Sequence, residues 1–181
     1  MTTLPTRVRE LSDRLSATRD LPLARDLAMV GARVGLAWLF IYHGAGTLFG
    51  AFGGLGVHRA SVFYGTVAHL HPATFFAVLG GSIEFFGGIA VGVGILGRLA
   101  AAALVGDMII AMVTVTFHNG IVSNAAGSGY ELNVALAALA LVVAILGTGR
   151  VSLDFAVRTF LQKGSETTPS APPVTSSRRS G

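Results

Sequence analysis

Four long apolar stretches, separated by connections that contain glycine or polar residues, set the pattern of this chain. They cover residues 27–49, 73–96, 99–118 and 130–146, and each is long enough to cross a bilayer as a helix. The pattern therefore predicts an all-α integral membrane protein, a four-helix bundle with short interfacial helices.

The segments around the four-helix transmembrane domain, residues 27–149, differ in composition. Residues 1–26 are basic with apolar residues at helical spacing, which predicts an amphipathic leader helix on the membrane surface; a disordered leader is the alternative. A short interfacial helix is expected within 50–72. Residues 150–163 are amphipathic and predicted to be interfacial, whereas the Ser/Thr/Pro-rich tail 164–181 is predicted to be disordered.

Basic residues gather on one side of the predicted bundle. Eleven of the 13 Lys and Arg residues lie in the terminal segments or in the turn between the second and third stretches, whereas the other two connections hold only Arg59. The positive-inside rule then predicts a multi-pass protein of the cell membrane with both termini in the cytoplasm. The pI of about 10.3 reflects arginines that meet lipid head groups, so a nucleic-acid partner is not expected.

The chain contains no cysteine. This excludes a dithiol relay within the chain, an iron–sulfur cluster, covalently attached haem and any disulfide. Redox chemistry would therefore need a bound cofactor or a partner protein.

Three charged residues lie well inside the apolar stretches, away from their ends. A rise of about 1.5 Å per residue puts Arg33, Asp107 and Glu84 roughly 9, 13 and 18 Å from the cytoplasmic ends of their helices. Glu84 lies on a ridge with Gly80, Gly88 and Gly92, which predicts that it faces a neighbouring helix. A buried Arg33–Asp107–Glu84 cluster that binds a ligand or moves a proton is one interpretation. The other is a structural ion pair that fixes the helix register.

A second group of polar residues lies toward the outer ends of the helices. His118 shares a helix stripe with Asp107, His43 shares a broad face with Arg33, and Tyr130 and Glu131 open the fourth helix at the same level. These positions predict a polar path from the outer surface toward Glu84. The five histidines are spaced poorly for shared ligation, so haem or metal binding is not favoured.

Taken together, these residues resemble the DoxX family of small four-helix membrane proteins, over residues 27 to 154. The matching pieces, in chain order, are Arg33, His43-Gly44, Leu48-Phe49-Gly50, Gly53-Gly54, Glu84, Gly87-Gly88, Gly97-Arg98, His118-Asn119-Gly120, Gly129-Tyr130-Glu131, Gly149-Arg150 and Ser152-Leu153-Asp154. The family commonly has a lysine where this chain has Thr47. Either His43 and His118 substitute for that lysine, or this chain does not share the chemistry that the lysine serves.

The resemblance implies a quinone-linked redox system, because the family includes subunits linked to quinol oxidase and thiosulfate:quinone oxidoreductase. In that interpretation Glu84 and Asp107 handle protons, and Arg33, His43, His118, Tyr130 and Glu131 bind the quinone. Redox-enzyme proteins would be the partners, and the chain would be a subunit of a membrane oxidoreductase. The alternatives are a non-catalytic docking subunit and a small proton or solute transporter. Glycine ridges also permit a homo-oligomer.

Overall fold

The computed structural model describes residue 7 and residues 22–123 and 127–166, and every regular element in these parts is helical. The elements, in order, are α2 (Pro22–Phe49), η2 (Ala51–Gly53), α3 (Gly56–Thr66), α4 (Ala73–Val93), α5 (Gly97–Ala111), η3 (Met112–Thr116), η4 (Phe117–Asn119), α6 (Glu131–Leu146) and α7 (Leu153–Glu166). The predicted all-α class is confirmed. The structure does not describe residues 1–21, apart from Arg7, or residues 167–181. The predictions made above for these parts of the leader and of the tail therefore lie outside the described residues.

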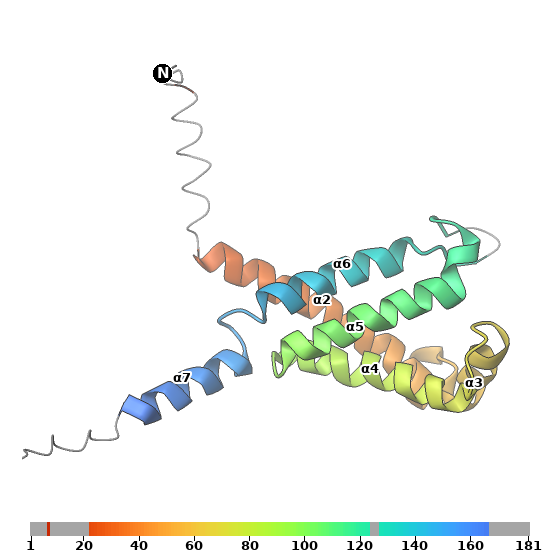
Figure 1. Ribbon diagram of the computed structural model, residues 1–181, viewed down its shortest axis with the longest axis horizontal. Coiled ribbons are helices and arrows are strands. Elements are labelled where there is room, and N and C mark those ends of the chain that lie inside the picture. Colours follow the sequence, from red (N-terminus) through yellow and green to blue (C-terminus); the bar gives the residue numbers. More distant parts are fainter. Residues whose placement is uncertain (1–6, 8–21, 124–126, 167–181) are drawn as a thin grey trace, which may run out of the picture.

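Helices α2, α4, α5 and α6 run side by side as a bundle (Figure 1). Helix α4 packs between α2 and α5, and α6 covers α5 on the other side. Among the described residues, Arg33 is the one charged side chain that is fully buried. The apolar core consists of Met29, Leu36, Phe40, Val91, Ala101, Leu104, Met108, Leu136, Ala140 and Val143. Burial of these aliphatic and aromatic groups brings the four helices together.

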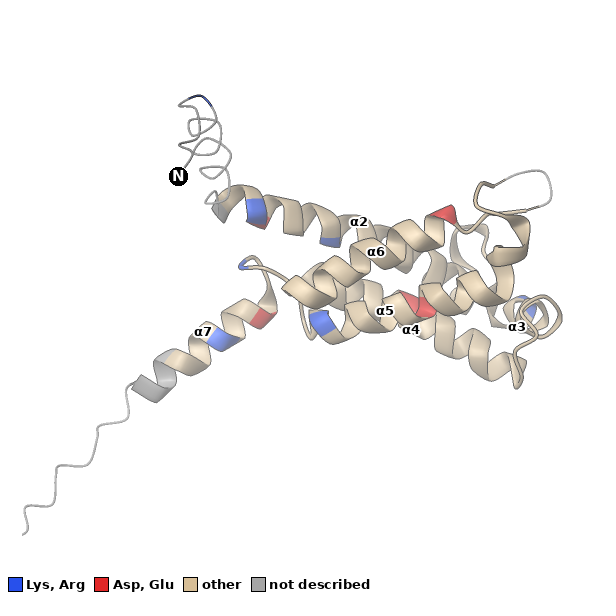
Figure 2. Ribbon diagram, turned by 45° about the horizontal axis from the view of Figure 1, so that its top comes forward, with Lys and Arg blue, Asp and Glu red and all other residues tan. Residues whose placement is uncertain are grey.

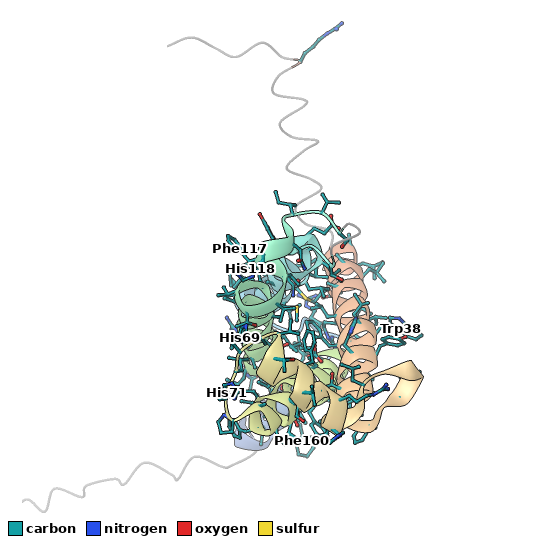
Figure 3. The ribbon with its side chains drawn as sticks, turned by 90° about the vertical axis from the view of Figure 1, so that its right-hand side faces the viewer. Trp38, His69, His71, Phe117, His118 and Phe160 are labelled. Carbon is teal, nitrogen blue, oxygen red and sulfur yellow. The ribbon has the colours of Figure 1, made fainter. Side chains whose placement is uncertain are left out.

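The outside of the bundle carries many large apolar side chains. Trp38 projects from α2 away from the other helices and is 73% exposed, and Phe86, Leu99 and Val113 are also more than half exposed (Figure 3). Contiguous apolar surface of this kind is rare on a soluble protein and is what a lipid environment requires.

Among the residues that the structure describes, three helices are long and apolar enough to cross a membrane: Leu23–Phe49, Ala73–Val93 and Gly97–Asn119. Helix α6 is apolar but has 16 residues, or about 24 Å, against a hydrocarbon core of about 30 Å. The third helix contains a wider π-helical turn at Met112–Thr116 and ends in the 3₁₀ turn Phe117–Asn119. The structure is therefore a multi-pass membrane bundle in which α6 is the short member.

The two ends of the bundle differ in the segments that they carry. The start of α2, the end of α6 and α7 lie at one end, whereas α3, the connection 50–55 and the loop residues 120–123 and 127–130 lie at the other (Figure 1). Most of the described Lys and Arg residues are at the end that carries α7 (Figure 2). Which end faces the cytoplasm remains a prediction of the positive-inside rule.

Glycines let α2 and α4 approach closely. A Cβ on Gly44 would lie 2.8 Å from the carbonyl oxygen of Gly81, and one on Gly92 would lie 2.9 Å from the Cβ of Ala37. The ridge predicted on α4 is divided between neighbours: Gly88 and Gly92 face α2, but Gly80 faces Tyr64 of α3 and Asp107 of α5. Four-residue steps exceed the 3.6-residue turn, so such a ridge winds around the helix.

Candidate functional site

A cavity of about 360 Å³ lies between α3, α4 and α5, and both intramembrane acids line it. We call it the acidic cavity. Its lining residues are Phe63, Tyr64, Ala68, Leu70, Phe76, Leu79, Gly80, Ile83, Glu84, Ala103, Gly106, Asp107, Ile110, Ala111, Thr114, Val115 and Thr116. Most of these are apolar, so the two carboxyl groups and the Tyr64 phenol stand out as its chemically active groups.

Glu84 and Asp107 come from antiparallel helices that touch along their length. Helix α4 carries Glu84 near its middle, α5 carries Asp107, and both residues line the same cavity. Each is only half-buried because the cavity opens beside it. Two carboxyl groups in one apolar cavity favour a proton held by one of them, since two adjacent negative charges are costly there.

Gly80 makes the meeting of these groups sterically feasible. A Cβ at this position would lie 2.7 Å from Tyr64 Oη and 3.6 Å from Asp107 Oδ1. Because glycine has no side chain, the phenol of Tyr64 can pack directly against α4, beside the carboxyl group of Asp107.

Tyr64 is a site residue that sequence reasoning missed. Burial raises the pKa of its phenol above the ordinary value, and the nearby carboxyl groups of Glu84 and Asp107 raise that pKa further. The phenol therefore stays protonated at neutral pH and can donate a hydrogen bond. The available signal was its position one turn after Ala60, the buried residue of α3, which marks the inward face of that helix.

Arg33 does not join the acids, which corrects the predicted Arg33–Asp107–Glu84 cluster. Its side chain is 4% exposed and donates four hydrogen bonds of 2.5 to 2.9 Å, all to backbone carbonyl oxygens. The acceptors are Val91 and Gly92 at the end of α4, and Thr148 and Val151 in the link from α6 to α7.

The correction has a geometric reason. Helical side chains lean toward the N-terminus of their own helix, so the guanidinium of Arg33 extends toward the basic end of the bundle and away from the acids. The last carbonyls of α4 lie there without intrahelical partners. Counting residues along α2 predicted the depth of the Arg33 Cα atom, but the guanidinium group lies nearer the basic end of the bundle than that atom.

The predicted outer residues do not line the acidic cavity. His43 is exposed and lines a separate hollow with Tyr42, Thr47 and the 51–55 connection. Thr47 also packs on Gly81, with its Cγ2 2.9 Å from the place of a Cβ there. His43 and the position of the family lysine thus share one hollow, beside α2 rather than beside the acids.

His118, Tyr130 and Glu131 lie together around the outer loop. His118 is exposed beside Phe117 (Figure 3), and Phe117 stacks on Tyr130 with ring centroids 5.6 Å apart. Glu131 accepts a hydrogen bond from the backbone of Ser123. These contacts fold the loop onto the start of α6. Within the described parts of the chain, no three His, Asp or Glu residues are grouped as metal ligands.

Further polar contacts beside the cavity come from the π-helical turn η3, which follows α5. Thr116 is buried, lines the cavity and donates a hydrogen bond to Asn133 Oδ1 of α6, and Asn133 in turn contacts the sulfur of Met108. These groups continue the polar wall from Asp107 toward the outer end of the bundle.

Comparisons with known proteins agree with the features described above. The family model of DoxX matches residues 28–119, which include Glu84, Asp107 and Tyr64. The comparisons with curated proteins and with solved structures gave no match. The family match covers half of the chain and all three helices that are long enough to cross a membrane. The chain is therefore a membrane protein of the DoxX family.

Proposed function

We propose that this chain is a quinone-interacting subunit of a membrane redox system and that the acidic cavity takes the quinone ring. The observation that carries the proposal is the convergence of two carboxyl groups and a protonated phenol on one largely apolar cavity. Its volume falls in the range of small-molecule sites, about 300–1,000 Å³.

The rim of the cavity supports a ligand that arrives from the lipid. Leu79 of α4 and Ile110 of α5 line the cavity and are also 41% and 51% exposed on the outside of the bundle. A lipid-soluble molecule can therefore enter between α4 and α5 without crossing water.

The lining also fits the polar atoms of a quinone. A bound quinone would accept electrons from a partner, and its two carbonyl oxygens need protons when it is reduced. The phenol of Tyr64 can donate a hydrogen bond to one oxygen, and Glu84 and Asp107 can hold and release the protons. Since His43, His118 and Glu131 lie outside this cavity, the proposal assigns them no contact with the ring.

Quinone content tests the proposal. The full chain is purified in native lipid from wild type, Glu84→Gln and Glu131→Gln, and the extracted quinone is measured per protein. We expect near-stoichiometric quinone in wild type and Glu131→Gln, because Glu131 is exposed and outside the cavity, and at least about a tenfold lower content in Glu84→Gln.

Two further variants keep the test decisive. Should Glu84→Gln fail to accumulate in the membrane, Asp107→Asn and Tyr64→Phe address the same cavity from the two other helices. A wild-type protein without quinone, or an equal loss in the Glu84 and Glu131 variants, would refute the proposal. Proton or solute flux through wild-type vesicles would then favour a transporter, and its absence a docking subunit.

A further inference from the structure

A second cavity, of about 380 Å³, lies at the basic end of the bundle, where α5 begins, α6 ends and α7 leads away (Figure 2). Arg98 of α5 and Arg158 of α7 both line it. We call it the basic cavity. It is far along the helices from Glu84 and shares no lining residue with the acidic cavity.

The guanidinium groups of Arg98 and Arg158 differ in their hydrogen bonding. Arg98 donates from Nε to the carbonyl of Ala144 and from Nη2 to that of Ile145, at the end of α6. These bonds fix its guanidinium, and Nη1 has no hydrogen-bond acceptor within the part of the chain that the structure describes. Arg158 is exposed and has no hydrogen-bond partner among the described residues, so its donors are free to meet a ligand.

The acid that lines the basic cavity, Asp154, already has hydrogen-bond donors on both carboxylate oxygens. The two carboxylate oxygens of Asp154 accept hydrogen bonds from the backbone N–H groups of Leu96 and Gly97, and Thr148 Oγ1 lies within 3.5 Å. Two arginines against one satisfied carboxylate leave an excess positive charge, which attracts an anion.

Large apolar side chains line the same cavity. Leu96, Leu99 and Leu146 are 68%, 71% and 53% exposed, so they present hydrocarbon to the outside beside the two cations. A free phosphate ion would gain nothing from these leucines. A molecule with an anionic head and an apolar body would use both parts of the site.

From this geometry we propose that the basic cavity binds the head group of an anionic phospholipid, with the acyl chains lying against Leu96, Leu99 and Leu146. The site lies where the apolar helices end and the basic residues gather, which is the level of lipid phosphates in a bilayer. It is independent of the quinone proposal, because neither cavity needs the other to be occupied.

Lipid retention in native mass spectrometry tests this site. The full chain in detergent is supplied with equal amounts of phosphatidylglycerol and phosphatidylcholine that have the same acyl chains. We expect wild type to retain more phosphatidylglycerol, and Arg158→Gln to lower that preference about fivefold. The matched control is Arg25→Gln, which removes one exposed charge at the same end but outside the cavity and should leave the preference unchanged.

Three results would overturn the proposal. Wild type could retain both lipids equally, or the two variants could lose the preference to the same extent, which would mean diffuse charge attraction. Displacement of the lipid by an equal concentration of inorganic phosphate would make the free ion the ligand. Arg158→Lys guards against misfolding: it keeps the charge and should retain most of the preference, whereas Arg158→Glu should abolish it.

Discussion

At the scale of single residues, absent side chains decide which groups can meet. Gly80 lets the Tyr64 phenol and the Asp107 carboxyl group approach α4, and Gly44 lets the backbone of α2 lie against that of α4. A site made from residues of three helices depends on such close approach, because each polar group can reach only a few ångströms from its own backbone.

A methyl group at Gly44 should separate α2 from α4. Its Cβ would lie 2.8 Å from both Gly81 O and Phe85 Cα, atoms of backbone that cannot turn aside. We expect Gly44→Ala to lower the free energy of unfolding by about 1–3 kcal/mol, measured by unfolding in mixed detergent micelles. Gly35→Ala is the control, since nothing lies within 4 Å of its Cβ. Equal effects of the two variants would show that the close approach is not required.

At the scale of elements, the basic end of the bundle is joined by hydrogen bonds between distant segments. Arg33 of α2 connects the end of α4 to the link between α6 and α7. Asp154 of α7 caps the first turn of α5, and its own N–H donates to Gly94 O. Asp154 belongs to the same arrangement, because it satisfies N–H groups that a helix start leaves free.

The planar guanidinium of Arg33 should be essential for this arrangement. A lysine keeps the charge but cannot reach four carbonyl oxygens on two segments at once. We expect Arg33→Lys to lower the free energy of unfolding by about 2 kcal/mol or more, because buried carbonyls lose charged donors. Arg25→Lys, at an exposed position of the same helix, should have no measurable effect. If both variants unfold alike, the hydrogen bonds contribute nothing net.

The wider turn of α5 shows how an element shapes the cavity. Thr114, Val115 and Thr116 are consecutive and all line the acidic cavity. In a regular helix three consecutive residues point in directions about 100° apart. The π-helical turn at Met112–Thr116 alters this spacing next to Asp107, in the manner of the single π turns often found at functional sites.

At the scale of the whole molecule, an apolar belt separates two polar ends of different charge. The end with α7 carries most of the described arginines, and the opposite end carries α3 and the outer loop (Figure 2). This asymmetry is what orients multi-pass proteins during insertion.

Cysteine labelling tests the predicted orientation against a clean background, because the chain has no cysteine of its own. Single replacements are made at His58 of α3 and at Arg150, both exposed and at opposite ends of the bundle. A membrane-impermeant maleimide applied to intact cells should label His58→Cys and spare Arg150→Cys until the cells are opened. The reverse pattern would invert the topology.

The sequence by itself determined the class of the protein, the number of helices in the bundle and the family. Length and hydropathy decide these, because a bilayer accepts only helices of sufficient apolar length. The sequence also singled out Glu84 and Asp107, because a charged residue inside an apolar stretch can be recognised from the sequence alone. The helix start at Ala73 was also predicted, from the hydrophobic boundary of the second stretch.

Only the tertiary structure decided which of these groups share a site. Whether Arg33 meets an acid or a helix end depends on the lean of its side chain and on the partner that ends beside it. Whether His43 shares a cavity with Glu84 depends on the rotation of α2 about its axis, and Tyr64 enters because α3 folds back over α4. The rotation of a helix about its axis, the direction of a side chain and the position of α3 over α4 all result from packing between segments that are distant in sequence. The spacing of hydrophobic residues along one segment therefore cannot predict them.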